Sequence, residues 1–437
     1  MKKFMILAAV AMLVGRASAA VRDTISLNAG WQFHLGELAG IEAVKNAKSE
    51  RVNLPHDFLI GQPWVEPDAS ERPDNSDAGS NVRSRLSPRG FKEMNVGWYR
   101  YVLTPKAEWK GRRVVLDFQG IMLVGDVWLN GKHIGKTDYG YLGFDTDISS
   151  ILKFDGDNEI IVKANTQQPN NSRWYTGGGL YRDVNLIVTD KKLYFPRHPL
   201  FIRTENNKKV KIQAEIACFN KVDNIPAEVK IYDANGEVVA QKKQNIVFNG
   251  KWRTREYELQ TIEIDNANLW SCESPYLYTA EVTLFDNQGN VVDQIREQFG
   301  VRTIEFSPDF GFKLNGKKVL LKGYANHHTL GALGAAAYPR AIEKRIQLMK
   351  SFGYNHIRTS HNPYSEDFMR LCDRYGILVV DELYDKWLTQ YAGGRVEWEA
   401  LWQRDVPEWV KRDRNHPCVV LWSLGNELQQ YPNLPFN

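Results

Sequence analysis

Residues 413–427 decide the fold of the C-terminal region, and they read DRNHPCVVLWSLGNE. The apolar run at residues 419–422 has the length of one buried strand, and the polar residues that follow it end in Asn426 and Glu427. A helical pattern over residues 398–414 precedes this strand. A helix that leads into a buried strand is typical of the repeating units of a parallel α/β sheet.

Three earlier segments show the same arrangement. Strands are predicted at residues 319–321, 355–358 and 377–380, and helices at residues 340–352 and 365–375. The polar residues that follow these strands are Asn326, His327 and His328, then Arg358, Ser360 and His361, then Asp381 and Glu382. Four such units make half of an eight-stranded (β/α)8 barrel, whose active site lies where the strands end. We therefore expect an active site at this face.

The first two thirds of the chain have the pattern of all-β domains. Short strands such as residues 97–103 alternate with turns, and Asn130-Gly131 is a strong signal for a two-residue hairpin. Residues 66–89 are polar and are predicted to form a surface loop. A boundary is expected near Pro196, and the strand-rich stretch after it has the size of an immunoglobulin-like sandwich.

The composition argues against a nucleic-acid partner and against a disulfide framework. The formal net charge is only +4 over 437 residues, and the two signs are mixed, so nucleic acid is a poor candidate partner. Four cysteines in so long a chain do not make a disulfide framework. Cys372 and Cys418 lie in apolar patterns typical of buried thiols, whereas Cys218 and Cys272 could pair or stay free.

The N-terminus has the pattern of a signal peptide. Lys2 and Lys3 precede an apolar run at residues 4–14, and small residues suited to cleavage follow at residues 17–19. The alternative is a membrane anchor, but the apolar run is short for a bilayer. We expect an exported protein, periplasmic or extracellular, with no membrane attachment after cleavage.

This expectation predicts the start of the mature chain. Mass spectrometry of the secreted or periplasmic protein should find Ala20 or Val21 as the first residue, because signal peptidase cuts after small residues. Soluble cytoplasmic protein that keeps Met1 would contradict it.

Two segments resemble signatures of glycoside hydrolase family 2. Residues 355–363, NHIRTSHNP, are similar to one signature, and residues 413–427 are similar to the acid/base signature. Residues 128–131 and 179–184 resemble the family's jelly-roll sugar-binding domain. The resemblance implies a multidomain β plus α/β fold. The expected divisions are a signal peptide at 1–19, a jelly-roll β-sandwich at 20–195, an immunoglobulin-like β-sandwich at 196–303 and a partial TIM barrel at 304–437.

The resemblance also implies a retaining mechanism that uses two carboxyl groups. Glu427 matches the acid/base residue, which protonates the leaving oxygen and later deprotonates water, and which needs a raised pKa for the first step. The family's nucleophile is a Glu on the seventh barrel strand, which would lie beyond Asn437. We therefore expect residues 1–437 alone to be an inactive, aggregation-prone fragment.

Further residues match positions that contact the substrate in the family. Asn426 matches a residue that hydrogen-bonds the sugar 2-hydroxyl, and Arg358 matches an arginine that orients the nucleophile. His361 matches a contact to the sugar or the transition state. His327 and His328 resemble the histidines after the first strand, and His327 is the stronger candidate of the two.

Three other candidates have alternative roles. Asp381 and Glu382 match an acidic pair that either contacts the sugar or supports the site through hydrogen bonds. Arg173 lies in a loop that reaches the barrel mouth in the family, and a surface role is equally consistent with its pattern. Residues 383–388 lack the Glu and His that bind magnesium in some relatives, so no metal and no cofactor are expected.

The favoured activity is that of a β-galactosidase acting on terminal β-D-galactosides of oligo- or polysaccharides. β-Glucuronidases tend to have Ala before the Asn-Glu pair and Pro after it, whereas this chain has Gly425 and Leu428. β-Mannosidase does not fit residues 358–361. A non-catalytic carbohydrate-binding fragment is the alternative outside the enzymes. The expected partner is a carbohydrate, and a homo-oligomer is left open.

Overall fold

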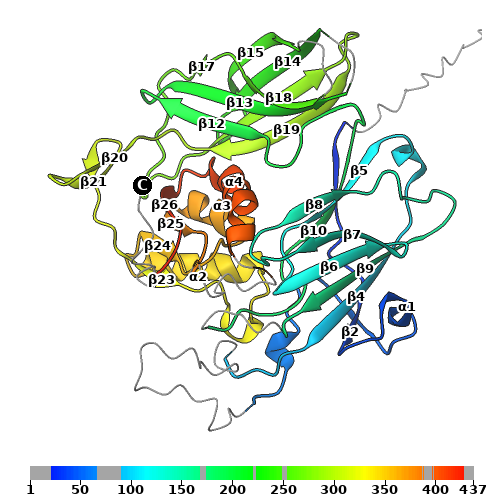
Figure 1. Cartoon of the computed structure of the whole chain (residues 1–437). Coiled ribbons are helices and arrows are strands. Elements are labelled where there is room, and N and C mark those ends of the chain that lie inside the picture. Colours follow the sequence, from blue (N-terminus) through cyan, green and yellow to red (C-terminus); the bar gives the residue numbers. More distant parts are fainter. Residues whose placement is uncertain are drawn as a thin grey trace, which may run out of the picture.

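The computed structural model describes residues 21–65, 90–167, 174–219, 223–248, 253–385, 387, 396 and 398–427. Two β-sandwiches and a parallel α/β sheet follow one another along the chain (Figure 1), which confirms the predicted fold class. The predicted signal peptide, the predicted loop at residues 66–89 and Arg173 lie outside the described residues. Among the described residues, no helix is long and apolar enough to cross a membrane.

The first sandwich consists of two antiparallel sheets. The smaller sheet has the order β1 (Asp23–Ser26), β10 (Val184–Thr189), β5 (Arg113–Phe118) and β8 (Phe144–Asp147). The larger sheet has the order β3 (Glu50–Val52), β2 (Trp31–Leu35), β4 (Val96–Leu103), β9 (Asn158–Asn165), β6 (Val124–Leu129) and β7 (Lys132–Thr137). Short helical turns α1 (Ile41–Val44), η1 (Leu59–Gly61) and η4 (Ala107–Trp109) connect the strands. The predicted hairpin is confirmed, since Asn130 and Gly131 link β6 to β7 with φ of 51° and 83°.

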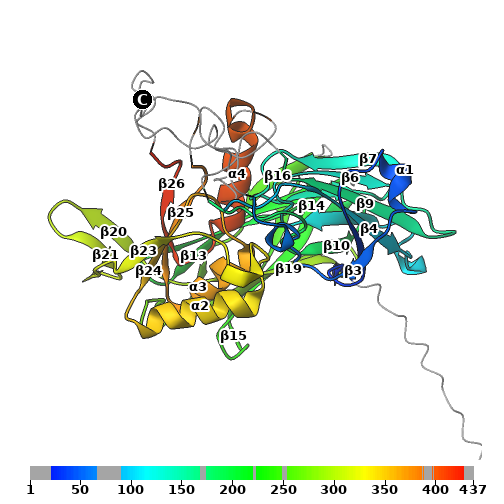
Figure 2. The ribbon, with the colours of Figure 1, turned by 90° about the horizontal axis from the view of Figure 1, so that it is seen from below.

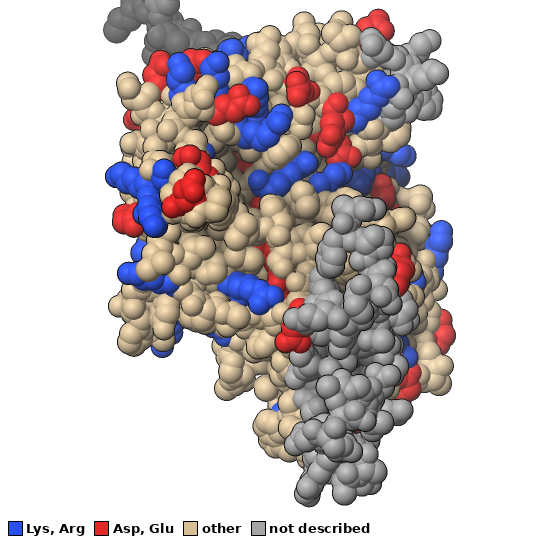
Figure 3. Space-filling view, turned by 60° about the vertical axis from the view of Figure 1, so that its left-hand side comes forward, with Lys and Arg blue, Asp and Glu red and all other residues tan. Residues whose placement is uncertain are grey.

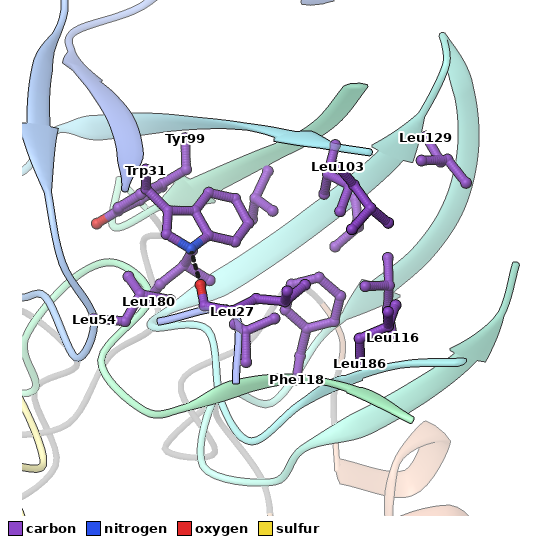
Figure 4. Packing of buried hydrophobic residues seen from close by; sticks show 14 of the residues in the cluster. Leu27, Trp31, Leu54, Tyr99, Leu103, Leu116, Phe118, Leu129, Leu180 and Leu186 are labelled. Carbon is purple, nitrogen blue, oxygen red and sulfur yellow. Dashed lines mark hydrogen bonds between the residues drawn. The ribbon is translucent and has the colours of Figure 1, made fainter. Parts of the chain in front are cut away.

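The core of this sandwich lies between its two sheets. Trp31 and Phe118 are fully buried there, and the Trp31 indole donates a hydrogen bond of 2.6 Å to the carbonyl of Leu27 (Figure 4). Burial of one such side chain stabilises the fold by about 1.5–3 kcal/mol. The indole N–H is satisfied inside the core, so the packing carries no penalty for that polar group.

The second sandwich follows the same principle. One sheet contains β11 (Leu193–Tyr194), β13 (Lys209–Cys218) and β12 (Leu200–Glu205), with β16 (Arg253–Glu258) and β17 (Ile262–Glu263) also paired to β13. The other sheet has the order β15 (Val238–Val247), β14 (Asn224–Tyr232), β18 (Tyr278–Phe285) and β19 (Val291–Phe299). A small sheet of β20 (Ile304–Ser307), β21 (Gly311–Leu314) and β22 (Lys317–Lys318) leads to the C-terminal region.

The C-terminal region is a parallel sheet with crossover helices. Its order is β23 (Gly323–Asn326), β24 (His356–Thr359), β25 (Leu378–Glu382) and β26 (Val419–Ser423). The connections contain η5 (Gly331–Leu333) and α2 (Pro339–Ser351), α3 (Glu366–Tyr375), and η6 (Trp398–Ala400) and α4 (Trp402–Asp413). Figure 2 shows the three α-helices on one side of this sheet. Because the four strands run parallel, they end at a common edge of the sheet, as predicted.

The first strand of this sheet was predicted at the wrong place. Residues 319–321 are apolar, but Leu320 is 70% exposed and the strand starts only at Gly323. A Cβ atom on Gly323 would lie 2.1 Å from the carbonyl oxygen of His356. The close approach of β23 to β24 therefore needs glycine, and this contact sets the start of the strand.

All four cysteines are buried, and none of them forms a disulfide. This confirms the prediction for Cys372 and Cys418, and it decides the open alternative for Cys218 and Cys272 against a disulfide between them. The α/β region and the sandwiches instead stay together through packing and hydrogen bonds.

The polar start of the 413–427 stretch joins the parallel sheet to the second sandwich. The Asn415 amide accepts a hydrogen bond from the backbone N–H of Ile202 and donates one to the carbonyl of Leu200. Burial alone would lower the pKa of His416, but the Asp373 carboxylate, 2.5 Å away, raises it to about 9. An imidazolium at neutral pH thus anchors the start of β26, so this part of the stretch is structural.

Candidate active site

Glu382, at the end of β25, is the centre of the predicted site. Its carboxylate is fully buried and accepts hydrogen bonds from both Nε and Nη2 of Arg358, at 2.9 and 2.6 Å. It also accepts one from the hydroxyl of Ser423 at 2.7 Å, and its other oxygen lies 2.5 Å from Nδ1 of His361. Residues from β24, β25 and β26 thus meet on one buried carboxylate, as expected for the carboxyl edge of a parallel sheet.

Asn426 is held in one orientation from both sides. Its side-chain oxygen accepts a hydrogen bond of 3.0 Å from Arg358, and its side-chain nitrogen donates one of 2.8 Å to Asp385. The Asn426 backbone N–H also donates to the carbonyl of Asp385. Asp385 is almost fully buried, and sequence reasoning did not assign it a role. Its only signal was its place three residues after a strand with other site residues.

Glu427 directly follows this fixed asparagine. Its side chain is exposed and its backbone is in the left-handed region, with φ of 50°. A non-glycine residue rarely adopts this conformation, and such residues are frequent at functional sites. The hydrogen bonds of Asn426 therefore set where the chain presents the Glu427 carboxyl group.

Two histidines and a tryptophan form an aromatic cluster beside this network. The ring of Trp174 stacks on His327, with centroids 4.6 Å apart and planes inclined by 25°. Trp174 also meets His361 edge to face at 5.4 Å. Nδ1 of His327 is 3.0 Å from the carbonyl oxygen of Ser360. Trp174 comes from the first sandwich. No role was predicted for it from the sequence, although it directly follows Arg173, whose loop is expected to reach the barrel mouth.

His328 does not belong to this cluster. Its ring lies against Tyr141, Tyr181 and Tyr364, and its Nε2 is 3.3 Å from the carbonyl oxygen of Thr176. Burial, followed by the charge of Arg182, lowers the pKa of His328 to about 3. A neutral histidine in this position has a structural role, so of the two neighbours only His327 faces the site.

The structure separates the acidic pair Asp381 and Glu382. Consecutive residues of a strand point to opposite faces, and Asp381 points toward the helices. It accepts hydrogen bonds from the Trp409 indole at 2.6 Å and from the Thr359 hydroxyl at 3.4 Å, and it lies beside the carboxyl group of Asp413. Burial and the neighbouring Asp413 charge raise the pKa of Asp381 well above its usual range.

The raised pKa predicts how Asp381→Asn changes stability. The folded state keeps a proton on Asp381 that the unfolded chain releases above about pH 4, so this group lowers the free energy of unfolding as the pH rises from there. Asparagine can donate to Asp413 without a proton to lose. We therefore expect the thermal midpoint of Asp381→Asn, minus that of the wild type, to be larger at pH 8 than at pH 5.

Asp413→Asn tests the other member of this pair. Asp413 is the partner of the buried Arg412, with N–O distances of 2.5 and 2.8 Å, so its substitution removes the hydrogen-bonded carboxylate from a buried cation. We expect a lower thermal midpoint at both pH values. The same pH dependence in Asp381→Asn as in the wild type would contradict the assignment.

No group of three or more His, Cys, Asp or Glu in the part of the chain that the structure describes is arranged to hold a metal ion. The site carboxylates described above bind Arg358, His361, Ser423 and Asn426 instead. The expectation that the protein uses no metal or cofactor stays a prediction.

Comparison with models of known protein families gives three matches between residues 91 and 434. Residues 91–181 match the model "Glycosyl hydrolase 2 galactose-binding domain-like", residues 198–302 match "Glycosyl hydrolases family 2", and residues 308–434 match "Glycosyl hydrolases family 2, TIM barrel domain". The three models follow the order of the two sandwiches and the parallel sheet.

Individual relatives support the same assignment. The β-galactosidase BoGH2A of Bacteroides ovatus is 32% identical over an alignment of 429 residues, gaps included, that covers 93% of this chain and 47% of that protein. A β-glucuronidase of Bacteroides fragilis is 27% identical over an alignment of 437 residues, gaps included, that covers 95% of this chain and 58% of that protein.

Solved structures agree with these relatives. The crystal structure of a glycosyl hydrolase family 2 member from Bacteroides cellulosilyticus superposes with a TM-score of 0.82 at 34% identity, covering 93% of this chain and 52% of that one. The chain spans about half the length of the relatives it matches. Because models of one family match all three structural parts in order, and relatives align across nearly the whole chain, this chain belongs to glycoside hydrolase family 2.

Proposed function

We propose that the full-length protein that carries this chain is a retaining β-glycosidase, and specifically a β-galactosidase. The observation that carries this proposal is the arrangement of Asn426 between Arg358 and Asp385, with Glu427 as the next residue, four positions after β26 ends. An oriented amide beside a carboxyl group suits a sugar whose 2-hydroxyl and glycosidic oxygen are close together.

Each group has a part in the proposed reaction. Glu427 protonates the leaving oxygen in the first step and deprotonates water in the second. Asn426 binds the 2-hydroxyl, and hydrogen bonds there strengthen in the transition state. Glu382 balances the charge of Arg358 and fixes His361, so the donors stay oriented without reorganisation.

The sugar specificity rests on the residue before the Asn-Glu pair. Relatives named β-galactosidase and β-glucuronidase both align with this chain, so the family alone leaves the choice between them. β-Glucuronidases tend to have Ala before the Asn-Glu pair, whereas this chain has Gly425, and this difference supports galactose.

Three tryptophans near Glu427 support an oligosaccharide or polysaccharide as the substrate. The Trp387 indole donates to the carbonyl of Leu424, three residues before Glu427. Trp398 lies 5.1 Å from Trp387, and Trp402 lies 6.4 Å from Trp398 and is 40% exposed. Flat apolar faces of sugars pack on indole rings. The exposed ring of this row, Trp402, can therefore receive a sugar of a longer substrate.

The test compares two chromogenic substrates on the full-length protein. We expect kcat/KM for an aryl β-galactoside to exceed that for the aryl β-glucuronide by about 100-fold, the discrimination typical of a site that lacks a partner for one polar group. A preference for the glucuronide would overturn the galactosidase assignment. Retention of galactosides without release of the aglycone would favour the non-catalytic binding protein.

We also propose that the protein is exported. The proposal rests on Lys2, Lys3 and the apolar run at residues 4–14, followed by small residues at 17–19. The mature start at Ala20 or Val21 is its test.

Both charge signs are interspersed on the molecular face in Figure 3, which suits a protein that meets neutral sugars rather than a polyanion.

A further inference from the structure

A buried carboxylate outside the network of Glu382 joins the first sandwich to the parallel sheet. Asp57 is 6% exposed, and each of its oxygens accepts two hydrogen bonds. One oxygen accepts from the backbone N–H groups of Leu59 and Gly178, both at 2.9 Å. The other accepts from the Tyr175 hydroxyl and from the backbone N–H of Ala335, both at 2.7 Å.

The chain is shaped to bring two loops onto this carboxylate. Gly177 and Gly334 have φ of 83° and 63°, and Cβ atoms on them would lie 2.9 and 2.3 Å from Oδ2 of Asp57. Side chains at these positions would therefore clash with the carboxylate. Gly177 belongs to the first sandwich, whereas Gly334 lies in the loop between β23 and α2. Both loops approach Asp57 more closely than they could with any residue other than glycine at these two positions.

These two loops carry the aromatic cluster of the site. Tyr175, which donates to Asp57, directly follows Trp174. Ala335, the other partner of Oδ2, lies in the loop that starts with His327. Trp174 and His327 stack on each other at 4.6 Å. Oδ2 of Asp57 therefore accepts a hydrogen bond from each of the two segments that carry the stacked rings.

We propose that Asp57 is a positioning residue of the active site, which holds Trp174 of the first sandwich against His327 and His361. The structural part of this proposal stands by itself, and its effect on turnover rests on the proposed function.

Asp293 provides the matched control. It is also a fully buried carboxylate that joins two domains, since it accepts hydrogen bonds from Arg22, near the start of the first sandwich, and from the backbone N–H groups of Phe195 and Gln294. None of these residues touches the aromatic cluster. Asp293→Ala therefore removes a comparable set of hydrogen bonds far from the site.

The direct test is a proton spectrum of the histidine rings. In the deuterated full-length protein labelled at histidine Cε1, His327 should show an upfield shift from the ring current of Trp174, and His327→Gln assigns the signal. We expect Asp57→Ala to abolish this shift as Trp174→Leu does, and Asp293→Ala to keep it. Tyr175→Phe, which removes a single hydroxyl, should reduce it if Asp57→Ala does not fold.

Turnover provides the second readout. We expect Asp57→Ala to lower kcat/KM about 10- to 100-fold, the effect of misplacing site groups by about 1 Å, and Asp293→Ala to change it less than about twofold. An unchanged His327 shift in Asp57→Ala and in Tyr175→Phe would overturn the positioning role. A lost shift in a full-length protein that hydrolyses no glycoside would instead reject the proposed function and leave the positioning role intact.

Discussion

Glu427→Gln in the full-length protein is expected to lower kcat/KM for natural β-galactosides by about 10²–10⁴-fold, the usual contribution of a general acid/base. Such substrates have poor leaving groups, so bond cleavage needs the proton that glutamine cannot give. The fixed geometry of Asn426 should survive, because its hydrogen bonds with Arg358 and Asp385 are kept in this variant. Steady-state kinetics with an oligosaccharide measure the loss.

An activated substrate separates the two steps of the reaction. An aryl galactoside with a good leaving group forms the glycosyl-enzyme without acid assistance, but the intermediate then waits for a base to deprotonate water. Glu427→Gln should therefore release one equivalent of phenol in a burst and accumulate the intermediate. Azide, a nucleophile that needs no base, should restore turnover and give the β-galactosyl azide.

Glu108→Gln is the control for this experiment, since Glu108 is an exposed glutamate on η4 of the first sandwich with no part in the proposed chemistry. It should leave the kinetics unchanged with both substrates. Absence of both the accumulated intermediate and azide rescue in Glu427→Gln, or formation of the α-azide, would show that Glu427 is not the acid/base.

The strand ends could be located from sequence because of regular local patterns. Apolar runs followed by polar residues predicted the positions of Arg358, Glu382 and Asn426 at one edge, and the structure brings these three into one network. The same pattern misplaced the first strand, because nothing in the apolar residues 319–321 shows that Gly323 must pack on His356.

Contacts between domains could not be predicted in this way. Asp57 and Trp174 lie in the first sandwich, and they reach the site through loops whose approach depends on the packing of two domains. The pair Asp381 and Glu382 shows a smaller limit of the same kind. The sequence shows two carboxylates at a strand end, but only the position of the helices decides which one faces Trp409.

The second large effect is expected for Glu382→Gln, which should lower both the free energy of unfolding and kcat/KM. The carboxylate is fully buried and accepts from Arg358, His361 and Ser423, so an amide nitrogen in its place must face one of these donors. Breaking a buried ion pair from one side costs about 3–5 kcal/mol. The Arg358 side chain is 34% exposed and can regain water, so we expect the lower end, about 3 kcal/mol.

Glu281→Gln distinguishes the catalytic effect from the loss of a buried charge. Glu281 is a buried carboxylate of the second sandwich that accepts from Arg296 and Tyr232. Both variants should weaken protection from amide hydrogen exchange, in β24 to β26 for Glu382→Gln and in β18 and β19 for Glu281→Gln. Only Glu382→Gln should also lower kcat/KM, by about 10²-fold or more, because Arg358 and His361 then lose the orientation that the substrate requires. Equal activity in the two variants would mean that Glu382 supports the fold and not the site.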